Sequence, residues 1–239
     1  MLVDTLSASG LVWYTRFENS WASAVVRAAN SVLVRNTGGG KIQSITFSNF
    51  TSHSGNGTVP IIDIEAGSNI TISNSEICAD GGQTTATGIR IGAAARSINI
   101  LGNRIGTCWG TLTTGVEIVR GANILNINGN NFDSTTTPLL FSANNETALI
   151  TNNMGLDNIA PTQASAASVA LPVTAKVIIT GTTTISTLVG TWSNRQVTIL
   201  PTGALPFTTG GNICNALTAA ADVPVHALWD AGRNCWHLK

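Results

Sequence analysis

The sequence predicts an all-β protein, in which a parallel β-helix is followed by a small antiparallel β domain. Hydrophobic residues make up 43% of the 239 residues but charged residues only 10%, a poor composition for amphipathic helices. Short runs in which Ile and Val alternate with other residues recur along the middle of the chain, as is typical of strands. After residue 162 this recurrence stops, and short strands separated by Gly, Pro, Asn and Asp turns follow.

The recurrence divides the middle of the chain into units of about 23 to 30 residues, a length found in solenoid proteins. The units begin at Ser31, Ile61, Gly88, Gly115 and Pro138. A leucine-rich repeat would place Leu at fixed spacings and add a helix or tight turn to each unit. The aliphatic residues here are mostly Ile and Val, so the sequence favours a parallel β-helix.

Two apolar runs in each unit predict two strands with one buried face. The first runs contain Ile62/Ile64, Ile89/Ile91 and Val116/Ile118, and the second contain Ile70/Ile72, Ile98/Ile100 and Leu125/Ile127. We expect Ile62, Ile89 and Val116 to lie one above another in a shared interior column. An Asn follows each second run, at Asn74, Asn103 and Asn130. Because Asn tolerates left-handed backbone angles and bonds its neighbours, these residues are expected to form a ladder.

Outward positions of the first strands predict a column of alternating charge. With the first runs aligned, the column reads Arg35, Asp63, Arg90 and Glu117. Neighbouring turns lie about 4.8 Å apart, so opposite charges attract at every step of the column.

The domain organisation predicted from these patterns has three parts. Residues 1–162 form the β-helix, with an N-terminal cap or partial first coils. Residues 163–175 are a linker rich in small residues, and residues 176–239 form a C-terminal β domain that acts as a capping or trimerisation unit.

Charge and hydropathy exclude two classes of partner. The formal net charge is zero, with no run of Lys or Arg, so a nucleic-acid-binding surface is not expected. No window approaches the roughly 18 apolar residues of a membrane helix, so no membrane insertion is expected. The N-terminus lacks the charged region and apolar core of a signal peptide. The chain is therefore made and assembled in the cytoplasm, or is the downstream part of a longer exported chain.

The four cysteines form no CxxC pair, and we expect buried free thiols. A disulfide between Cys214 and Cys235 is the alternative. His53 lies in a polar stretch with Gly and Ser and is expected in an exposed loop. His226 and His237 lie near these two cysteines, but their spacings match no common zinc pattern. No metal and no cofactor are expected.

The C-terminal region resembles the end of phage tailspike and tail-fibre proteins. The resemblance rests on VTILPTG, TTGGN, TAAADVPVHALWD and AGRNCWH, while the coil pattern resembles pectate-lyase-type β-helices. It covers roughly residues 31–239 and departs from the family at Cys214 and Cys235. It implies a right-handed β-helix, a homotrimer closed by the C-terminal unit, a place in the virion tail and recognition of bacterial surface polysaccharide.

Paired carboxylates are the first candidates for catalysis. Asp63 and Glu117 would lie about 9.6 Å apart across two turns, near the upper limit for inverting glycosidases. Arg90 lies between them, which favours a structural salt ladder. Glu76 and Asp80 flank Cys78 on an expected loop, with Asp133 on the equivalent loop of a later coil.

Sugar binding has separate candidates. Trp109, on a coil loop, is expected to be exposed and able to stack on a sugar ring, and Arg90 is the candidate polar partner. Trp229 and Trp236 are expected to be core or trimer contacts.

Three functions remain open at this stage. The favoured one is non-enzymatic recognition of host surface polysaccharide by a tailspike-like chain. A polysaccharide-degrading hydrolase or lyase is the first alternative. A secreted or cell-surface bacterial adhesin is the second.

Overall fold

A computed structural model of the chain describes residues 1–239 except 25–28, 55–56, 83, 120–122 and 143–146. The described residues form strands and turns, and none of them belongs to a helix that could cross a membrane. The chain divides into two compact units. The first runs to Gly155 and the second begins at Leu156, apart from residues 146–148, which group with the second.

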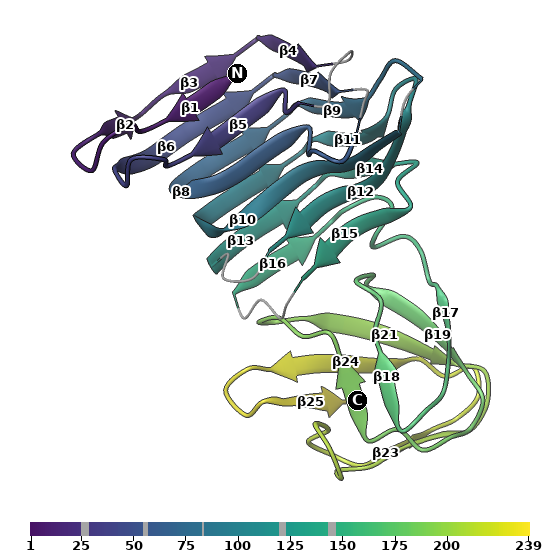
Figure 1. The fold of residues 1–239 in the computed structure, drawn as a ribbon. Coiled ribbons are helices and arrows are strands. Elements are labelled where there is room, and N and C mark those ends of the chain that lie inside the picture. The colour runs from purple at the N-terminus through teal and green to yellow at the C-terminus, as the bar shows by residue number, and fades with distance from the viewer. Residues whose placement is uncertain (25–28, 55–56, 83, 120–122, 143–146) are drawn as a thin grey trace. The chain divides into compact units, whose positions relative to one another are not determined.

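The first unit is a parallel β-solenoid of about five turns (Figure 1). Every strand pair described within it is parallel, so the predicted β-helix is confirmed. Its strands, in chain order, are β1 (Leu2–Asp4), β2 (Leu11–Trp13), β3 (Arg16–Glu18), β4 (Trp21–Ala24), β5 (Val32–Arg35), β6 (Lys41–Ser48), β7 (Thr51–Ser54), β8 (Ile62–Ser73), β9 (Glu76–Ala79), β10 (Thr84–Leu101), β11 (Arg104–Thr107), β12 (Thr111–Ile118), β13 (Asn123–Asn128), β14 (Asn131–Asp133), β15 (Thr137–Phe141) and β16 (Ala148–Thr151).

Interior columns of aliphatic side chains hold the turns together. Ile89 pairs with Ile62 on one side and with Val116 on the other, and all three side chains are fully buried. The predicted shared column is therefore confirmed. Burying a Val or Ile side chain stabilises a fold by about 1.5–3 kcal/mol, and the column repeats this in each turn. Further columns stack Ile70, Ile98 and Leu125, and Ile72, Ile100 and Ile127.

A buried asparagine ladder closes the bends after β10, β13 and β16. Asn103, Asn130 and Asn153 are all buried, and the backbone N–H of each of the first two donates to the side-chain oxygen of the next, at 2.9 and 3.0 Å. The predicted ladder is confirmed for Asn103 and Asn130 but is wrong for Asn74. Asn74 is exposed with φ 50°, and Ser75 takes the ladder position by donating its N–H to Asn103 Oδ1.

The residue before each ladder position adopts a left-handed backbone. The φ angles are 50° at Asn74, 64° at Gly102, 69° at Gly129 and 57° at Asn152. Only Gly and Asn adopt this conformation at low cost. The bend therefore needs a Gly or Asn, followed by a residue whose side chain bonds the next turn.

The predicted charge column is confirmed in three of its four positions. Arg90 pairs with Asp63 and with Glu117 across adjacent strands. The prediction for Arg35 is wrong, because Leu33 pairs with Asp63 whereas Arg35 pairs with Asp4. Arg35 Nε donates to Asp4 Oδ2 at 2.9 Å in a different column.

The second unit is a small β domain that combines parallel and antiparallel pairs. Its strands are β17 (Thr162–Ala164), β18 (Ser168–Ala170), β19 (Lys176–Thr180), β20 (Thr187–Val189), β21 (Gln196–Pro201), β22 (Leu205–Phe207), β23 (Leu217–Ala219), β24 (Val225–Asp230) and β25 (Cys235–Leu238). The antiparallel pairs expected at the C-terminus are present as β21–β24–β25 and β22–β23. The pairs β17–β19–β21 and β18–β20 are parallel. Strand β18 and most of β17 lie within 163–175, where we expected a linker.

The core of the second unit contains the two C-terminal tryptophans. Trp229 and Trp236 are buried with ring centroids 5.6 Å apart, and Trp236 Nε1 donates to Leu188 O at 3.1 Å. The buried Arg195 lies over the Trp192 ring and donates to the backbone oxygens of Gly190 and Pro172. Burial lowers the pKa of Arg195 to about 9.

Candidate functional site

The first set of candidate residues lies on the outward side of β8, β10 and β12. Arg90 Nη1 is 3.3 Å from Asp63 Oδ2, and Asp63 is only 6% exposed. Burial raises the pKa of Asp63, and Arg90 opposes this shift without reversing it. The structure therefore brings Asp63, Arg90 and Glu117 into one column, with Asp63 covered and Glu117 half-buried.

The second set lies on the outward side of the sheet β4–β7–β9–β11–β14. His53, Glu76, Asp80, Arg104 and Asp133 form a continuous group that we call the charged face. Arg104 joins two of its acids, with Nη1 2.6 Å from Glu76 Oε1 and Nη2 2.7 Å from Asp133 Oδ2. Glu76 stands on strand β9, and Asp80 follows directly after it, so the loop expected around Cys78 is instead a strand.

His53 extends the charged face by one turn. Its Nδ1 is 3.2 Å from Asp80 Oδ2 and its Nε2 is 3.9 Å from Glu76 Oε2. We expected His53 in an exposed loop, but it lies on β7 and is half-buried. Its ring and the Trp21 ring are nearly perpendicular, at 81°, with the ring centroids 6.4 Å apart.

Hydrogen bonding favours the ionised form of one acid of the charged face, Asp133. Hydrogen bonds from Arg104, and then from Ser134, lower the pKa of Asp133. Burial alone would lower the pKa of Arg104, but its bonds to Asp133 and Glu76 outweigh this and raise it. An ionised, paired acid can accept hydrogen bonds from a ligand but is a poor proton donor.

Arg104 joins two acids of the charged face but was not among the candidates predicted from the sequence. Strand register pairs Arg104 with Glu76, and pairs Ile105 with Ile77 and with Phe132. The repeat in the sequence also aligns Ile77, Ile105 and Phe132. Glu76 and Arg104 each directly precede one of these apolar residues, so the alignment of the repeats could have predicted their pairing.

Both cysteine pairs form disulfides, and the expectation of free thiols is wrong. Cys78 is bonded to Cys108, and Cys214 is bonded to Cys235. The second bond is the disulfide that the sequence offered as the alternative to free thiols. Cys78 and Cys108 are 30 residues apart, about one turn of the solenoid. The first disulfide therefore joins consecutive turns, with Cys108 two residues beyond Gly106, the register partner of Cys78.

Trp109 stands on a turn that is anchored on both sides. The backbone N–H groups of Cys108 and Gly110 both donate to Ala79 O, at 2.9 and 3.2 Å, and Cys108 is tied to Cys78. The Trp109 side chain is 77% exposed, as expected. Its neighbour Cys108 has Sγ 3.5 Å from Arg104 Nη1, so the turn adjoins the charged face.

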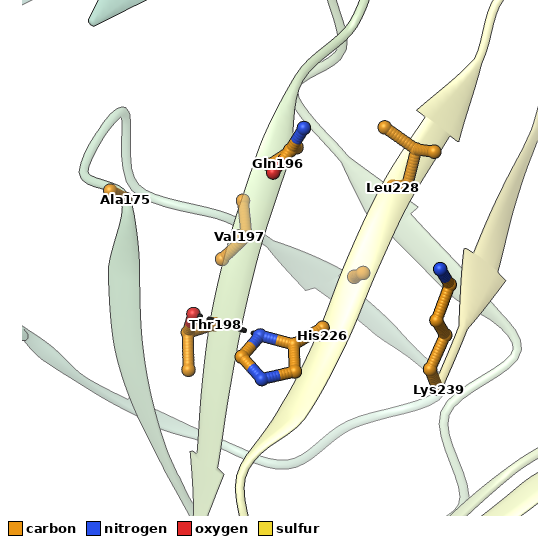
Figure 2. Close-up of a pocket in the computed structure, with 8 residues that line it drawn as sticks. Ala175, Gln196, Val197, Thr198, His226, Leu228 and Lys239 are labelled. Carbon is orange, nitrogen blue, oxygen red and sulfur yellow. Dashed lines mark hydrogen bonds between the residues drawn. The ribbon is translucent and has the colours of Figure 1, made fainter.

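A pocket of about 440 Å³ lies on the second unit, on the outward side of β21 and β24 (Figure 2). Its polar side chains include Gln196, Thr198, His226 and Lys239, and Leu228 adds an apolar wall. Thr198 Oγ1 lies 3.3 Å from His226 Nδ1. None of the described side chains that line it is acidic, so the pocket cannot supply a pair of catalytic carboxylates.

Comparison with protein-family models, with curated proteins and with solved structures finds no match. The fold and the chemistry of these side chains are therefore the basis for a function.

Proposed function

We propose that the chain is the receptor-binding part of a tailspike-like particle protein. It recognises a bacterial surface polysaccharide through Trp109 and the charged face, without cleaving it. The observation that carries this proposal is the anchored turn, which holds a tryptophan 77% exposed beside a group of charged side chains.

An exposed tryptophan on a fixed turn is suited to sugar binding for a physical reason. The indole ring offers a flat apolar face to the C–H groups of a sugar ring. The disulfide and the two hydrogen bonds to Ala79 O fix the turn before binding, so little backbone entropy is lost when a ligand docks.

The charged face supplies the polar half of such a site. Glu76 and Asp133 are acceptors for sugar hydroxyls, and Arg104 is a donor, since each side chain is more than a third exposed. Because hydrogen bonding to Arg104 lowers the pKa of Asp133, this acid is a poor proton donor for glycoside cleavage. Binding without cleavage is therefore the function that this geometry favours.

The binding experiment compares two equally exposed aromatic residues. Trp109→Ala and Tyr14→Ala remove side chains that are 77% and 75% exposed. Each variant is titrated against an array of purified bacterial surface polysaccharides. Loss of an aromatic anchor costs about 2 kcal/mol, so we expect Trp109→Ala to weaken binding about 30-fold. Tyr14→Ala should leave it unchanged. Equal loss in both variants, or binding of the parent chain to no polysaccharide, would refute the proposal.

A polysaccharide hydrolase is the second candidate, and the raised pKa of Asp63 favours it. A carboxyl whose pKa is raised by burial can act as a general acid, with Glu117 as the base. This function predicts release of reducing ends from the bound polysaccharide, abolished by Asp63→Asn. The favoured function predicts binding with no release.

We further propose that the chain assembles as a homotrimer in a virion tail. Exposed apolar side chains on the first turn support burial against other copies; they include Leu2, Leu6, Leu11 and Trp13. Light scattering is expected to give three times the chain mass, and a monomer at micromolar concentration would contradict this. Peptides of the chain should be found in purified phage particles. Their presence on the bacterial surface instead would favour the adhesin.

A further inference from the structure

We infer that His53, Glu76, Cys78 and Cys108 form a zinc site when the disulfide between the two cysteines is reduced. One donor atom from each of these side chains lies within 4.8 Å of all the others. They come from three consecutive turns, on β7, on β9 and directly after β11. Two thiolates, one imidazole and one carboxylate are a donor set that suits tetrahedral zinc.

The orientation of His53 is the strongest sign of this site. Its Nδ1 faces Asp80 Oδ2 at 3.2 Å, the contact that commonly fixes a zinc-binding imidazole. Its Nε2 is buried, has no hydrogen-bond partner among the described residues, and lies 3.9 Å from Glu76 Oε2. A buried ring nitrogen without a partner costs free energy, and a metal ion would satisfy it.

Glu76 is divided between two roles. Its Oε1 is 2.6 Å from Arg104 Nη1, which leaves Oε2 on the side of His53. By bonding Oε1, Arg104 thus orients Glu76 so that Oε2 is free to bind a metal ion.

Charge balance also fits. A zinc ion with two thiolates and one carboxylate carries one net negative charge. The Arg104 guanidinium, 3.5 Å from Cys108 Sγ, offsets that charge. It also favours the thiolate form that zinc requires.

The chemistry starts from the disulfide and a thiol reductant. Two equivalents of the reductant give up two electrons and two protons to the S–S bond and become a disulfide themselves, leaving Cys78 and Cys108 as thiols. Zinc then displaces the two thiol protons, which pass to solvent. Opening the S–S bond lets the sulfurs separate to about 3.8 Å, as tetrahedral zinc with Zn–S of about 2.3 Å requires. The two turns thus stay joined by a disulfide when oxidised and by a metal when reduced.

The second disulfide provides a matched control. Cys214, Cys235 and His237 supply three donors that lie within 4.8 Å of one another, and Asp230 Oδ2 lies 3.4 Å from His237 Nε2, so these two cysteines could compete for a metal ion once they are reduced. The variant Cys214→Ser/Cys235→Ser therefore removes the competing thiols and should leave the proposed site intact.

The test uses this variant of the full chain, with Co²⁺ as the spectroscopic probe. After anaerobic reduction with a phosphine, Co²⁺ should bind one per chain. It should show the visible bands of a tetrahedral thiolate site, and one equivalent of Zn²⁺ should displace it. The oxidised chain should bind none. Asp80→Asn should weaken binding by about 10- to 100-fold, the usual effect of losing such an orienting partner.

Several results would overturn the inference. They are absence of tetrahedral bands after reduction, equal Co²⁺ binding by the oxidised chain, and undiminished binding when Cys78 and Cys108 are both replaced by Ser. If that double variant fails to fold, His53→Gln, which keeps both thiols, is tested instead. Loss of the tetrahedral Co²⁺ spectrum in this variant supports the inference, and an unchanged spectrum overturns it. The inference does not depend on the proposed polysaccharide binding, because no polysaccharide enters the test.

Discussion

Replacing Asn130 by Ala should destabilise the solenoid strongly, because this side chain bonds three successive turns. Asn130 Oδ1 accepts from the backbone N–H of Asn103 at 2.9 Å and from Asn103 Nδ2 at 3.0 Å. Asn130 Nδ2 donates to Ile100 O at 2.9 Å and to Asn153 Oδ1 at 3.0 Å. The substitution leaves the buried N–H of Asn103 without this partner, at a cost of about 1–3 kcal/mol, and removes three further bonds worth about 1 kcal/mol each. The free energy of unfolding should therefore fall by about 4–6 kcal/mol.

Scanning calorimetry can measure this loss, since each of the two units can give its own transition. A loss of this size lowers the Tm of a unit of this length by roughly 10–20 °C. The control is Asn99→Ala, which removes an outward side chain with one long contact, 3.5 Å from Thr71 Oγ1. It should change stability by less than about 0.5 kcal/mol. Equal effects of the two substitutions would refute the ladder as a source of stability.

Three further predictions concern charge and cross-links. Burial raises the pKa of Asp63 above its unfolded value, so the free energy of unfolding of the parent chain falls as the pH rises through the folded pKa. Asp63→Asn should therefore become more stable relative to the parent chain between about pH 4 and pH 7, as measured by urea titrations. A stability difference between the two chains that does not change with pH would contradict the raised pKa. The pKa of Asp133 is lowered, so the stability that it contributes is present above its unfolded pKa and is lost as the pH falls through the folded pKa. Asp133→Asn should therefore make the free energy of unfolding less sensitive to acid. An unaltered dependence of stability on acid pH would count against the pairing with Arg104. Replacing Cys78 and Cys108 by Ser removes a cross-link over 30 residues and should cost about 3–4 kcal/mol in metal-free buffer, measured by urea unfolding, whereas a cost near zero would show that the two turns need no cross-link.

Much of the solenoid could be predicted because its signal is local and repeated. The alternation of Ile62/Ile64 and Ile89/Ile91 fixes both the strand and its inward face, and this prediction is confirmed. The register failed at Arg35 because Val32, Leu33 and Val34 form a continuous apolar run. Such a run has no alternation, so it does not show which residue faces outward.

The asparagine ladder shows a limit of a different kind. Asn74 and Asn103 each follow a second strand, but a bend needs both a left-handed residue and a ladder residue. Asn suits either position. In the third turn Asn74 takes the first position and Ser75 the second, while Gly102 and Asn103 divide them in the fourth. Residue type alone could not separate these roles.

The places of Arg104 and His53 on the charged face, and the first disulfide, were missed because they depend on contacts between turns. Cys78 and Cys108 are about one turn apart, but their pairing also requires the turn after β11 to fold back toward β9. His53 was expected in a loop because Gly and Ser follow it in the sequence. Its strand is specified by the parallel partner strands β4 and β9, which the local composition does not encode.

Hydroxyl-radical footprinting tests the proposed binding surface most directly. Trp109 and Tyr14 are almost equally exposed in the free chain, at 77% and 75%, so the radical should reach and oxidise both residues. With a polysaccharide that binds the chain, Trp109 should become protected while Tyr14 stays reactive. Protection of Tyr14 without Trp109, or protection of neither residue at saturation, would contradict binding at the charged face.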